Sequence, residues 1–436
     1  MRWQVVPLFL GGAAAWLPEV ELRGLHSSTM AGLDPWARIA AELERSLVAY
    51  DRPSEADAVA RARATVGATA EAVLVLGGGL YVFEDHASMH KHKPHYFLST
   101  LLSVLERSPL PNFAAAWDVG ARGARCGHPA LAAIPCLAIA KQAGYAARGL
   151  LVPNPYFAHV EEWDERCAAW RNATPAWADR KQTVFWRGAV RSACGSGNVA
   201  RLEALTLTLS RPDLFDARAP SPPDAPDRDC EKTFPYTPAM VALATDAATA
   251  ARVAGEFVSV NKFSRWRSYL NLPGTMGGSY SRNLNFLWPM RGVVYLWDGP
   301  AVEWYYPGLE TGTTHAAVDG GNAVAAVAAV TSNASATSRL RAGSASVADD
   351  LLSGTGLERY WRLLAAALVR YFRLDAATLD AALADVDCDA LRRVAWKRPE
   401  GPFYDETPGE GHPVLYLPLA RNDPLRKRVR CRKSKS

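Results

Sequence analysis

Glycine, serine and arginine gather in one short segment, residues 273–282, in a pattern that could hold a phosphate group. The segment reads Pro-Gly-Thr-Met-Gly-Gly-Ser-Tyr-Ser-Arg and follows the strand-like segment 268–272, Ser-Tyr-Leu-Asn-Leu. Glycines let the backbone approach a diphosphate closely, and a helix beginning at Ser279 would point unpaired N–H groups at it. Arg282 adds a charged fork. The pattern predicts an anion site.

The elements around this segment must position it. A strand is expected at 292–297, and two carboxylates follow it, Asp298 directly and Glu303 shortly beyond. Strand, glycine-rich turn, helix and strand form one nucleotide-binding half of an α/β sheet. Apolar runs upstream predict a helix at 95–106 and several strands. These strands are 72–76, 81–83, 113–117, 135–140 and 149–152.

Two downstream segments have a composition of their own. Residues 212–236 are rich in proline and aspartate, which predicts a surface loop. Residues 322–346 are rich in alanine and serine, which predicts a helix followed by a loop. Alternating strands and helices in both halves of the chain indicate two doubly wound α/β domains facing a cleft.

Three blocks of sequence carry aromatic, glycine and arginine residues in a characteristic order. They are 266–274 with 279–282 and 303–307; 183–189 with Arg201; and 340–344 with Tyr360, Trp361 and Tyr371. These blocks resemble glycosyltransferase family 90, which includes the protein O-glucosyltransferases and the fungal capsule xylosyltransferases. The resemblance is strong from about residue 130 to 372. It implies a GT-B-like fold, in which two Rossmann-like domains face a cleft.

The resemblance also implies transfer of a sugar, glucose or xylose, from a UDP-sugar to a hydroxyl of a glycan or protein, with inversion at the anomeric carbon. Cationic and N–H groups must hold the departing diphosphate, so no metal ion or other cofactor is demanded. The residues that we assign to the UDP-sugar are Arg187, Gly188, Ala189, Arg201, Thr275, Gly277, Gly278, Ser279, Tyr280, Ser281, Arg282 and Glu303.

Several of these assignments have alternatives. Arg201 and Arg282 are the diphosphate candidates, but either could instead form a surface or interdomain ion pair. Glu303 could accept two ribose hydroxyls or be a solvated carboxylate at a helix start. Ala189 stands where the family often has a serine, so only a backbone contact to the nucleotide could survive there.

The catalytic base is the weakest part of the match. The protein O-glucosyltransferases carry an aspartate just past a strand of the first domain, and an ungapped match puts Ala121 there. Asp118 is the nearest carboxylate, and we assign it as the base. A turn cap is the competing role. The protein-modifying relatives also carry a longer acceptor-contacting loop after 154–157, so a folded protein acceptor like theirs is not expected. A rival hypothesis is a catalytically lapsed nucleotide-sugar- or glycan-binding protein.

Length and composition fit a two-domain enzyme. The chain has 436 residues, 49% hydrophobic and 21% charged, with a net charge of +5. We expect residues 1–25 to be a signal peptide or N-terminal apolar segment, 26–179 the acceptor-side domain, 180–420 the nucleotide-sugar-binding domain with closing helices, and 421–436 a basic tail. A buried first helix or a transit peptide remains open for the N-terminus.

The expected compartment is the lumen of the secretory pathway, which two sequons at Asn172 and Asn333 would suit. The expected partners are a UDP-sugar and a hydroxyl acceptor, with no nucleic acid and no stable membrane span. Seven cysteines permit disulfides, but no pairing can be deduced. A histidine-rich run, 86–95, could bind zinc, yet interleaved lysines favour a solvated loop.

Overall fold

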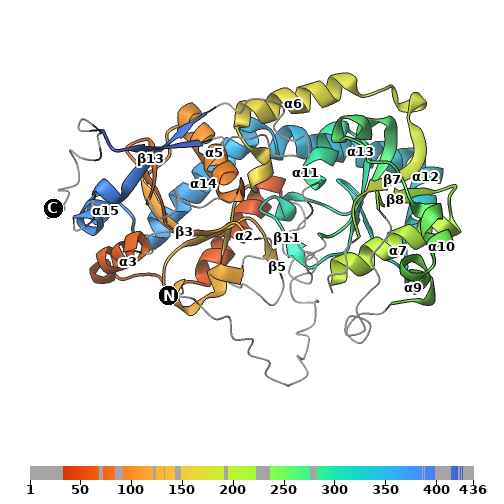
Figure 1. Cartoon of the computed structure of the whole chain (residues 1–436). Helices are drawn as coiled ribbons and strands as arrows, with labels where there is room; N and C mark the ends of the chain where they lie inside the picture. The colour runs from red at the N-terminus through yellow and green to blue at the C-terminus, as the bar shows by residue number, and fades with distance from the viewer. Residues whose placement is uncertain are drawn as a thin grey trace.

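The computed structural model describes residues 33–67, 72–83, 92–120, 124–131, 133–142, 149–190, 195–221, 236–274, 281, 283–384, 386, 388–397, 414–420, 423 and 425. Within them the chain forms a mixed α/β protein with two main sheets, seen at the two ends of the molecule in Figure 1. The α/β class predicted from the sequence is therefore confirmed.

The second sheet is wholly parallel, with the strand order β12-β10-β9-β7-β8. Its strands are β7 (Lys181–Arg187), β8 (Phe215–Arg218), β9 (Trp266–Asn271), β10 (Val293–Trp297) and β12 (Ala316–Val318). Alternate residues of β7 belong to two different cores. Val184 and Trp186 are part of one core, and Phe185 is part of the other. Both faces of this sheet are thus covered, as in a doubly wound domain.

The first sheet has the order β14-β13-β2-β1-β3-β4-β6, and of its pairings only β3 with β4 and β4 with β6 are parallel. Its strands are β1 (Ala72–Leu76), β2 (Gly79–Phe83), β3 (Phe113–Asp118), β4 (Cys136–Ala138), β6 (Leu150–Leu151), β13 (Leu391–Trp396) and β14 (Val414–Pro418). The first sheet is thus mixed, which differs from the parallel sheet of the doubly wound domain that the sequence predicts for this half. Gly77 and Gly78 have φ of +57° and +79°, which makes a tight hairpin and forces β1 and β2 to run antiparallel.

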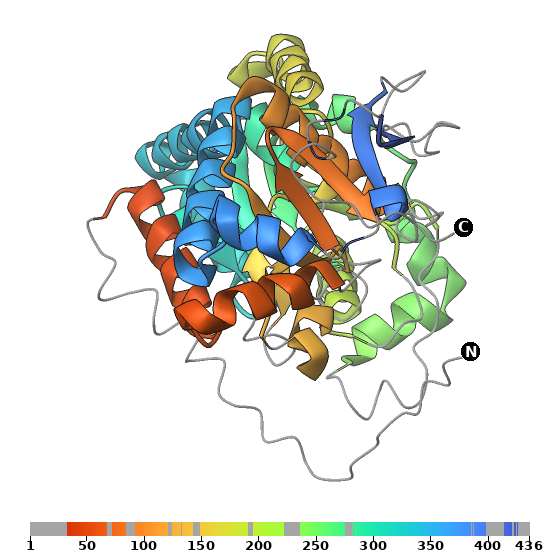
Figure 2. The same ribbon diagram turned by 90° about the vertical axis from the view of Figure 1, so that its left-hand side faces the viewer.

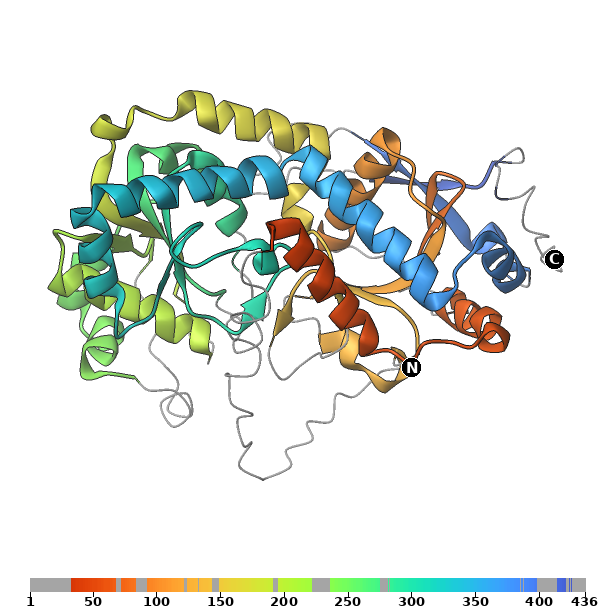
Figure 3. The same ribbon diagram turned by 180° about the vertical axis from the view of Figure 1, so that it is seen from behind.

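The end of the chain returns to the first sheet. Helix α14 (Gly354–Phe372) packs against α2 (Pro35–Val48), α5 (His92–Arg107) and β3, and β13 then hydrogen-bonds to β2. Figure 2 shows the blue β13 beside the orange strands, and Figure 3 shows the blue α14 beside the red α2. The last strands within the expected second domain, 180–420, therefore complete the first sheet.

Two sequence expectations about the second half are corrected. Residues 212–236 were expected to be a loop, but β8 lies within them and pairs with β7. Residues 322–346 were expected to end in a loop, but they form two helices, α12 (Ala323–Ser332) and α13 (Ala334–Ser346). Asn333 ends the first helix and caps the second by accepting from the N–H of Ala336. The remaining helices are α3 (Glu55–Gly67), α6 (Val160–Ala173), α7 (Ser196–Ser210), α9 (Pro238–Thr245), α10 (Ala247–Val253), α11 (Leu284–Leu287) and α15 (Ala376–Leu383).

The two sheets meet over one apolar core and one small ribbon. The larger core contains side chains of both sheets, for example Phe113 and Val294, together with Trp361 of α14. A two-stranded ribbon joins β5 (Lys141–Gln142), which follows β4, to β11 (Ala301–Val302), which follows β10. Among the described residues no helix is both long and apolar enough to cross a membrane.

A hydroxyl buried between α14 and the first sheet gives a test of this junction. The Tyr360 hydroxyl donates to the Leu151 carbonyl, and both residues are buried. Tyr360→Phe should lower the free energy of unfolding by about 1 to 3 kcal/mol, because the carbonyl loses its partner in a place that water does not reach. Tyr371→Phe is the matched control, since that hydroxyl bonds the Tyr50 carbonyl in a half-buried position. Denaturant titration showing equal losses in both variants would contradict the importance of the buried contact.

Candidate functional site

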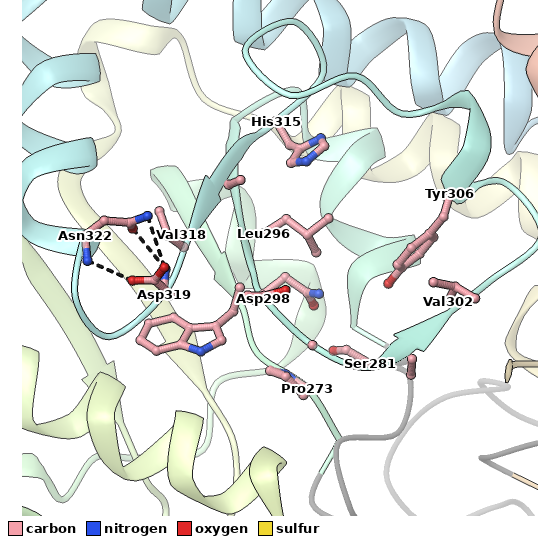
Figure 4. A pocket seen from close by; sticks show the side chains of 15 residues that line it. Pro273, Ser281, Leu296, Asp298, Val302, Tyr306, His315, Val318, Asp319 and Asn322 are labelled. Atoms are coloured by element: carbon pink, nitrogen blue, oxygen red, sulfur yellow. Dashed lines mark hydrogen bonds between the residues drawn. The ribbon is translucent and has the colours of Figure 1, made fainter. Parts of the chain in front are cut away.

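A pocket of about 330 Å³ lies outside the carboxyl ends of β9, β10 and β12. Figure 4 shows its polar lining, with Asp298 following β10 and both Asp319 and Asn322 following β12. Open parallel sheets bind their ligands at this edge, because all strand ends and their loops converge there. The pocket therefore has the position expected of a ligand site in this fold class.

Arg201 connects two of the predicted blocks beside this pocket. Its Nε donates to the Pro273 carbonyl at 3.0 Å and its Nη1 to the Ala189 carbonyl at 2.6 Å. Pro273 lines the pocket and follows β9, whereas Ala189 follows β7. On one side of β9 the sheet continues with β10 and then β12, and on its other side it continues with β7 and then β8. Arg201 thus lies at the point where the strand order reverses, which is where such sheets open a crevice.

The glycine-rich segment begins at the same place. Ser281 lines the pocket together with Pro273. The other predicted residues of this segment lie outside the described residues: Thr275, Gly277, Gly278, Ser279, Tyr280 and Arg282. Helix α11 begins at Leu284, a few residues after the predicted start. The proposed anion-holding turn remains a prediction.

The 187–189 block is divided between two environments. Arg187 ends β7 and forms two hydrogen bonds to the Asp216 carboxylate, at 2.9 and 3.1 Å, and it does not line the pocket. A Cβ at Gly188 would come within 2.5 Å of the Trp186 ring, which explains a glycine there without a ligand. Ala189 contributes its carbonyl to Arg201. Of the three, only Ala189 is tied to the edge of the pocket.

Glu303 is buried completely, so it is not the solvated carboxylate that the sequence left open. The Asn154 side-chain amide donates to its Oε2, while its Oε1 has no hydrogen-bond partner among the described residues. Burial raises the pKa of the Glu303 carboxyl to about 8, although the Asn154 hydrogen bond lowers it in part. Contact with a ribose would require this carboxyl to be uncovered. In the structure its hydrogen bond with Asn154 joins the two halves of the chain. The pKa of Tyr306 is raised by burial and by the Glu303 charge.

Three polar groups of the pocket were not predicted. Asn271 ends β9, is almost fully buried and leaves its Oδ1 without a partner in the described part of the chain. Asp319 accepts from the N–H groups of Gly321 and Asn322, in a turn that the sequence Asp-Gly-Gly-Asn could have signalled. His315 is held between the hydroxyls of Thr314 and Thr311, and burial lowers its pKa to about 4. It is therefore a neutral group at physiological pH.

Asp118 ends β3, at the carboxyl edge of the first sheet, as the sequence predicted for its strand. Its Oδ1 accepts from the N–H of Gly120 at 2.7 Å, so it does cap a turn. It does not line the pocket of the second sheet, and Ala121 lies outside the described residues. The β5–β11 ribbon brings the same edge of the first sheet to the pocket, because Ala301 and Val302 line it.

Other chemistry is limited in the described part of the chain, where no three histidine, cysteine or acidic side chains are grouped to hold a metal ion. The predicted histidine-rich run lies largely outside it, but His95 is buried and lies 2.6 Å from the Tyr416 hydroxyl. Cys126 and Cys136 form a disulfide, and Cys167 is a buried free thiol.

Comparison with known proteins adds no family to these observations. No protein-family model matches the chain, and no curated protein matches it. The resemblance to glycosyltransferase family 90 rests on the sequence blocks described above.

The buried Glu303 carboxyl predicts a pH-dependent stability. Its proton is held more tightly in the folded state, with a pKa of about 8 against an ordinary value of 4.5, so stability should fall as pH rises across that interval. Glu303→Gln removes the ionisation. Between pH 5 and pH 8 the free energy of unfolding of the variant should rise by about 2 to 4 kcal/mol relative to that of the unmutated protein, measured by chemical denaturation.

A matched variant checks the assignment to this carboxyl. Glu161 is an exposed carboxylate in the first turn of α6, and Glu161→Gln should not reproduce the pH-dependent gain. A constant difference between Glu303→Gln and the unmutated protein over the whole pH range would contradict a buried, protonated Glu303.

Proposed function

We propose that this protein is an inverting glycosyltransferase that moves a sugar, glucose or xylose, from a UDP-sugar to a hydroxyl of a glycan or protein. The observation that carries the proposal is the position of Arg201, which joins the loops after β7 and β9 at the strand-order reversal of a parallel sheet. The sequence that resembles a diphosphate-binding turn begins at one of those loops. The pocket beside it offers amide, carboxylate and hydroxyl groups to a nucleotide.

The proposed reaction needs two groups from this chain. The acceptor hydroxyl oxygen forms a bond to the anomeric carbon while the bond from that carbon to the diphosphate oxygen breaks, and UDP leaves with the electron pair. Asp118 takes the hydroxyl proton. Arg201, Arg282 and the backbone of the glycine-rich turn stabilise the charge that develops on the diphosphate. No metal ion or other cofactor takes part, because these cationic and N–H groups fill that role.

The GT-B arrangement is part of the proposal. Strand β4, which runs parallel to β3 in the first sheet, leads directly into β5, and β10 of the second sheet leads directly into β11; β5 and β11 pair with each other. Carboxyl ends of both sheets therefore approach one boundary, as acceptor and donor sites must in a two-domain transferase. The antiparallel part of the first sheet lies on the other side of β3 from β4 and does not alter this geometry.

A secretory location suits the proposed reaction. The Cys126–Cys136 disulfide is typical of oxidising compartments, and both sequon asparagines, Asn172 and Asn333, have exposed side chains. We propose the lumen of the secretory pathway, with a UDP-sugar and a hydroxyl-bearing acceptor as partners and without nucleic acid.

A second candidate is a catalytically lapsed nucleotide-sugar- or glycan-binding protein on the same fold. The hydrogen bond from Gly120 to Asp118 favours it, because that carboxylate already has a structural role. Alanines at 121 and 189, where the resembling family has polar residues, point the same way. The two candidates differ in whether UDP-glucose or UDP-xylose is turned over at all.

Removing the proposed diphosphate ligands should weaken UDP binding. Arg201→Ala and Arg282→Ala should each make UDP binding less favourable by about 1.5 to 3 kcal/mol, as measured by calorimetry. This is the range for a charged hydrogen bond. Arg211→Ala is the matched control, because Arg211 follows the other end of α7 and pairs with Asp213 at the surface. Unchanged UDP affinity in both test variants, with folding intact, would remove the site assignment.

Asp118 can be tested without disturbing its turn. Asp118→Asn keeps an oxygen that accepts from Gly120 but cannot take a proton, so turnover should fall about 100- to 10,000-fold while UDP affinity stays the same. Asp118→Ala removes both roles and should also lower stability. If Asp118→Asn turns over UDP-glucose normally, the residue is a turn cap and the base lies elsewhere. Absence of turnover in the unmutated protein with any donor would favour the lapsed candidate.

A further inference from the structure

A second pocket, of about 390 Å³, lies between the β7 and β8 edge of the parallel sheet and the segment 255–266 that leads into β9. It shares no lining residue with the pocket described above. Its lining is dominated by cationic side chains, and we call it the basic pocket. These side chains are Lys181, Arg187, Arg218, Lys262 and Arg265.

Carboxylates balance only part of this charge. Asp216 is shared, since it accepts from Arg187, from the Arg218 Nε at 2.9 Å and from the Trp266 indole at 3.2 Å. Among the described residues that line the pocket, Glu256 is the only carboxylate. Within this described set, five cations and the carboxylates Asp216 and Glu256 leave three positive charges around one concavity. Like charges held together in a partly desolvated place repel each other, so an anion in the pocket would relieve a real cost.

The cations of the basic pocket differ in the hydrogen bonds and ion pairs that they already form. Arg187 is held rigidly, because its side chain is only 9% exposed, yet its buried Nε has no hydrogen-bond partner among the described residues. Lys262 and Arg265 are exposed, and the described part of the chain gives neither of them an ion pair or a side-chain hydrogen bond. The pocket thus combines a fixed, desolvated guanidinium with two uncommitted charges.

Aromatic surface accompanies the charge. Phe257 lines the pocket with 53% of its surface exposed, although large apolar side chains are usually covered. The Lys181 ammonium lies 4.5 Å from the centre of the Trp266 ring. A ligand that fits must therefore bring negatively charged oxygens for the cations and an apolar ring face for Phe257.

We propose that the basic pocket is a second ligand site, which binds oxyanion groups such as sulfate, and that its ligand is a sulfated saccharide rather than free phosphate. Lys262 and Arg265 come from the segment before β9, and Arg187 and Arg218 from the ends of β7 and β8, so cations of different elements line one pocket and suit several anionic groups on one molecule. A sugar ring supplies the apolar face for Phe257. The site does not depend on the proposed transferase reaction, because it shares no residue with the pocket beside Arg201 and needs no turnover.

Calorimetry on the full chain with defined probes tests this. The probes are a trisulfated heparin disaccharide, the same disaccharide without sulfate, and inorganic phosphate. The sulfated disaccharide should bind, and more weakly as salt concentration rises, because exposed charges are screened. The double variant Lys262→Gln/Arg265→Gln should weaken its binding about tenfold. UDP affinity should not change in that variant.

A charge-matched control separates the pocket from general electrostatics. Arg362 and Arg370 are exposed on α14, and their paired replacement by glutamine removes the same charge from another element. It should leave binding of the sulfated disaccharide unchanged. An equal loss in both double variants, or equal binding of the unsulfated disaccharide, would overturn the site.

The two sources of oxyanion are also distinguished. Competition by inorganic phosphate at the same concentration as the disaccharide would keep the oxyanion site but assign it to a free anion. Absence of binding by all three probes would overturn the proposal. Vesicles that contain an anionic lipid serve as a fourth probe, and binding to these vesicles alone would also overturn it.

Discussion

The apolar core between the two sheets is the constraint on which the rest of this molecule depends. Trp163, Trp304 and Trp361 are buried in it, and Tyr360 packs against Trp304 with ring centres 4.4 Å apart. Truncation of such a side chain typically costs about 3 to 5 kcal/mol, a large part of the stability of any domain. Because α14 and the last strands belong to this core, the C-terminal end of the chain completes the first sheet that the N-terminal half begins.

This core also fixes where the two carboxyl edges meet. The β5–β11 ribbon has only two paired residues on each side and could not hold two sheets together by itself. Packing behind it holds the sheets, and the ribbon then brings Val302 to the pocket. The buried Glu303 beside Asn154 belongs to the same boundary. A buried carboxyl with one oxygen that has no partner among the described residues lowers stability, so its presence there is not explained by stability alone.

Charge is distributed unevenly over the parallel sheet. At its carboxyl edge Asp298, Asp319 and the amides of Asn271 and Asn322 face the first pocket, with Arg201 behind the loops. Beside β7 and β8 the balance is reversed, and cations exceed carboxylates. The two pockets thus differ in the chemistry they offer, with carboxylate and amide groups at the first and an excess of cations among the described lining residues at the second.

The sequence by itself determined most of the local structure. Runs of apolar residues marked β3 and β10, because a strand that is buried on both faces has no polar face to interrupt the run. The motif around 273–282 also pointed to the edge of the sheet where the first pocket lies, since it follows β9. The two glycines between the apolar runs 72–76 and 81–83 are a turn signal, and their positive φ values in the structure make the hairpin in which β1 and β2 run antiparallel.

Only the tertiary structure decided the long-range relations. The pairing of β13 with β2 joins residues about 300 positions apart, and no local pattern encodes such a partner. The same holds for individual side chains. Arg187 and Arg201 belong to the same sequence block, but in the structure Arg187 is paired with Asp216, whereas Arg201 donates to two loop carbonyls at the edge of the first pocket. Burial separates Glu303 from any exposed glutamate, because solvation is set by what the rest of the chain packs around a residue and not by its neighbours in sequence.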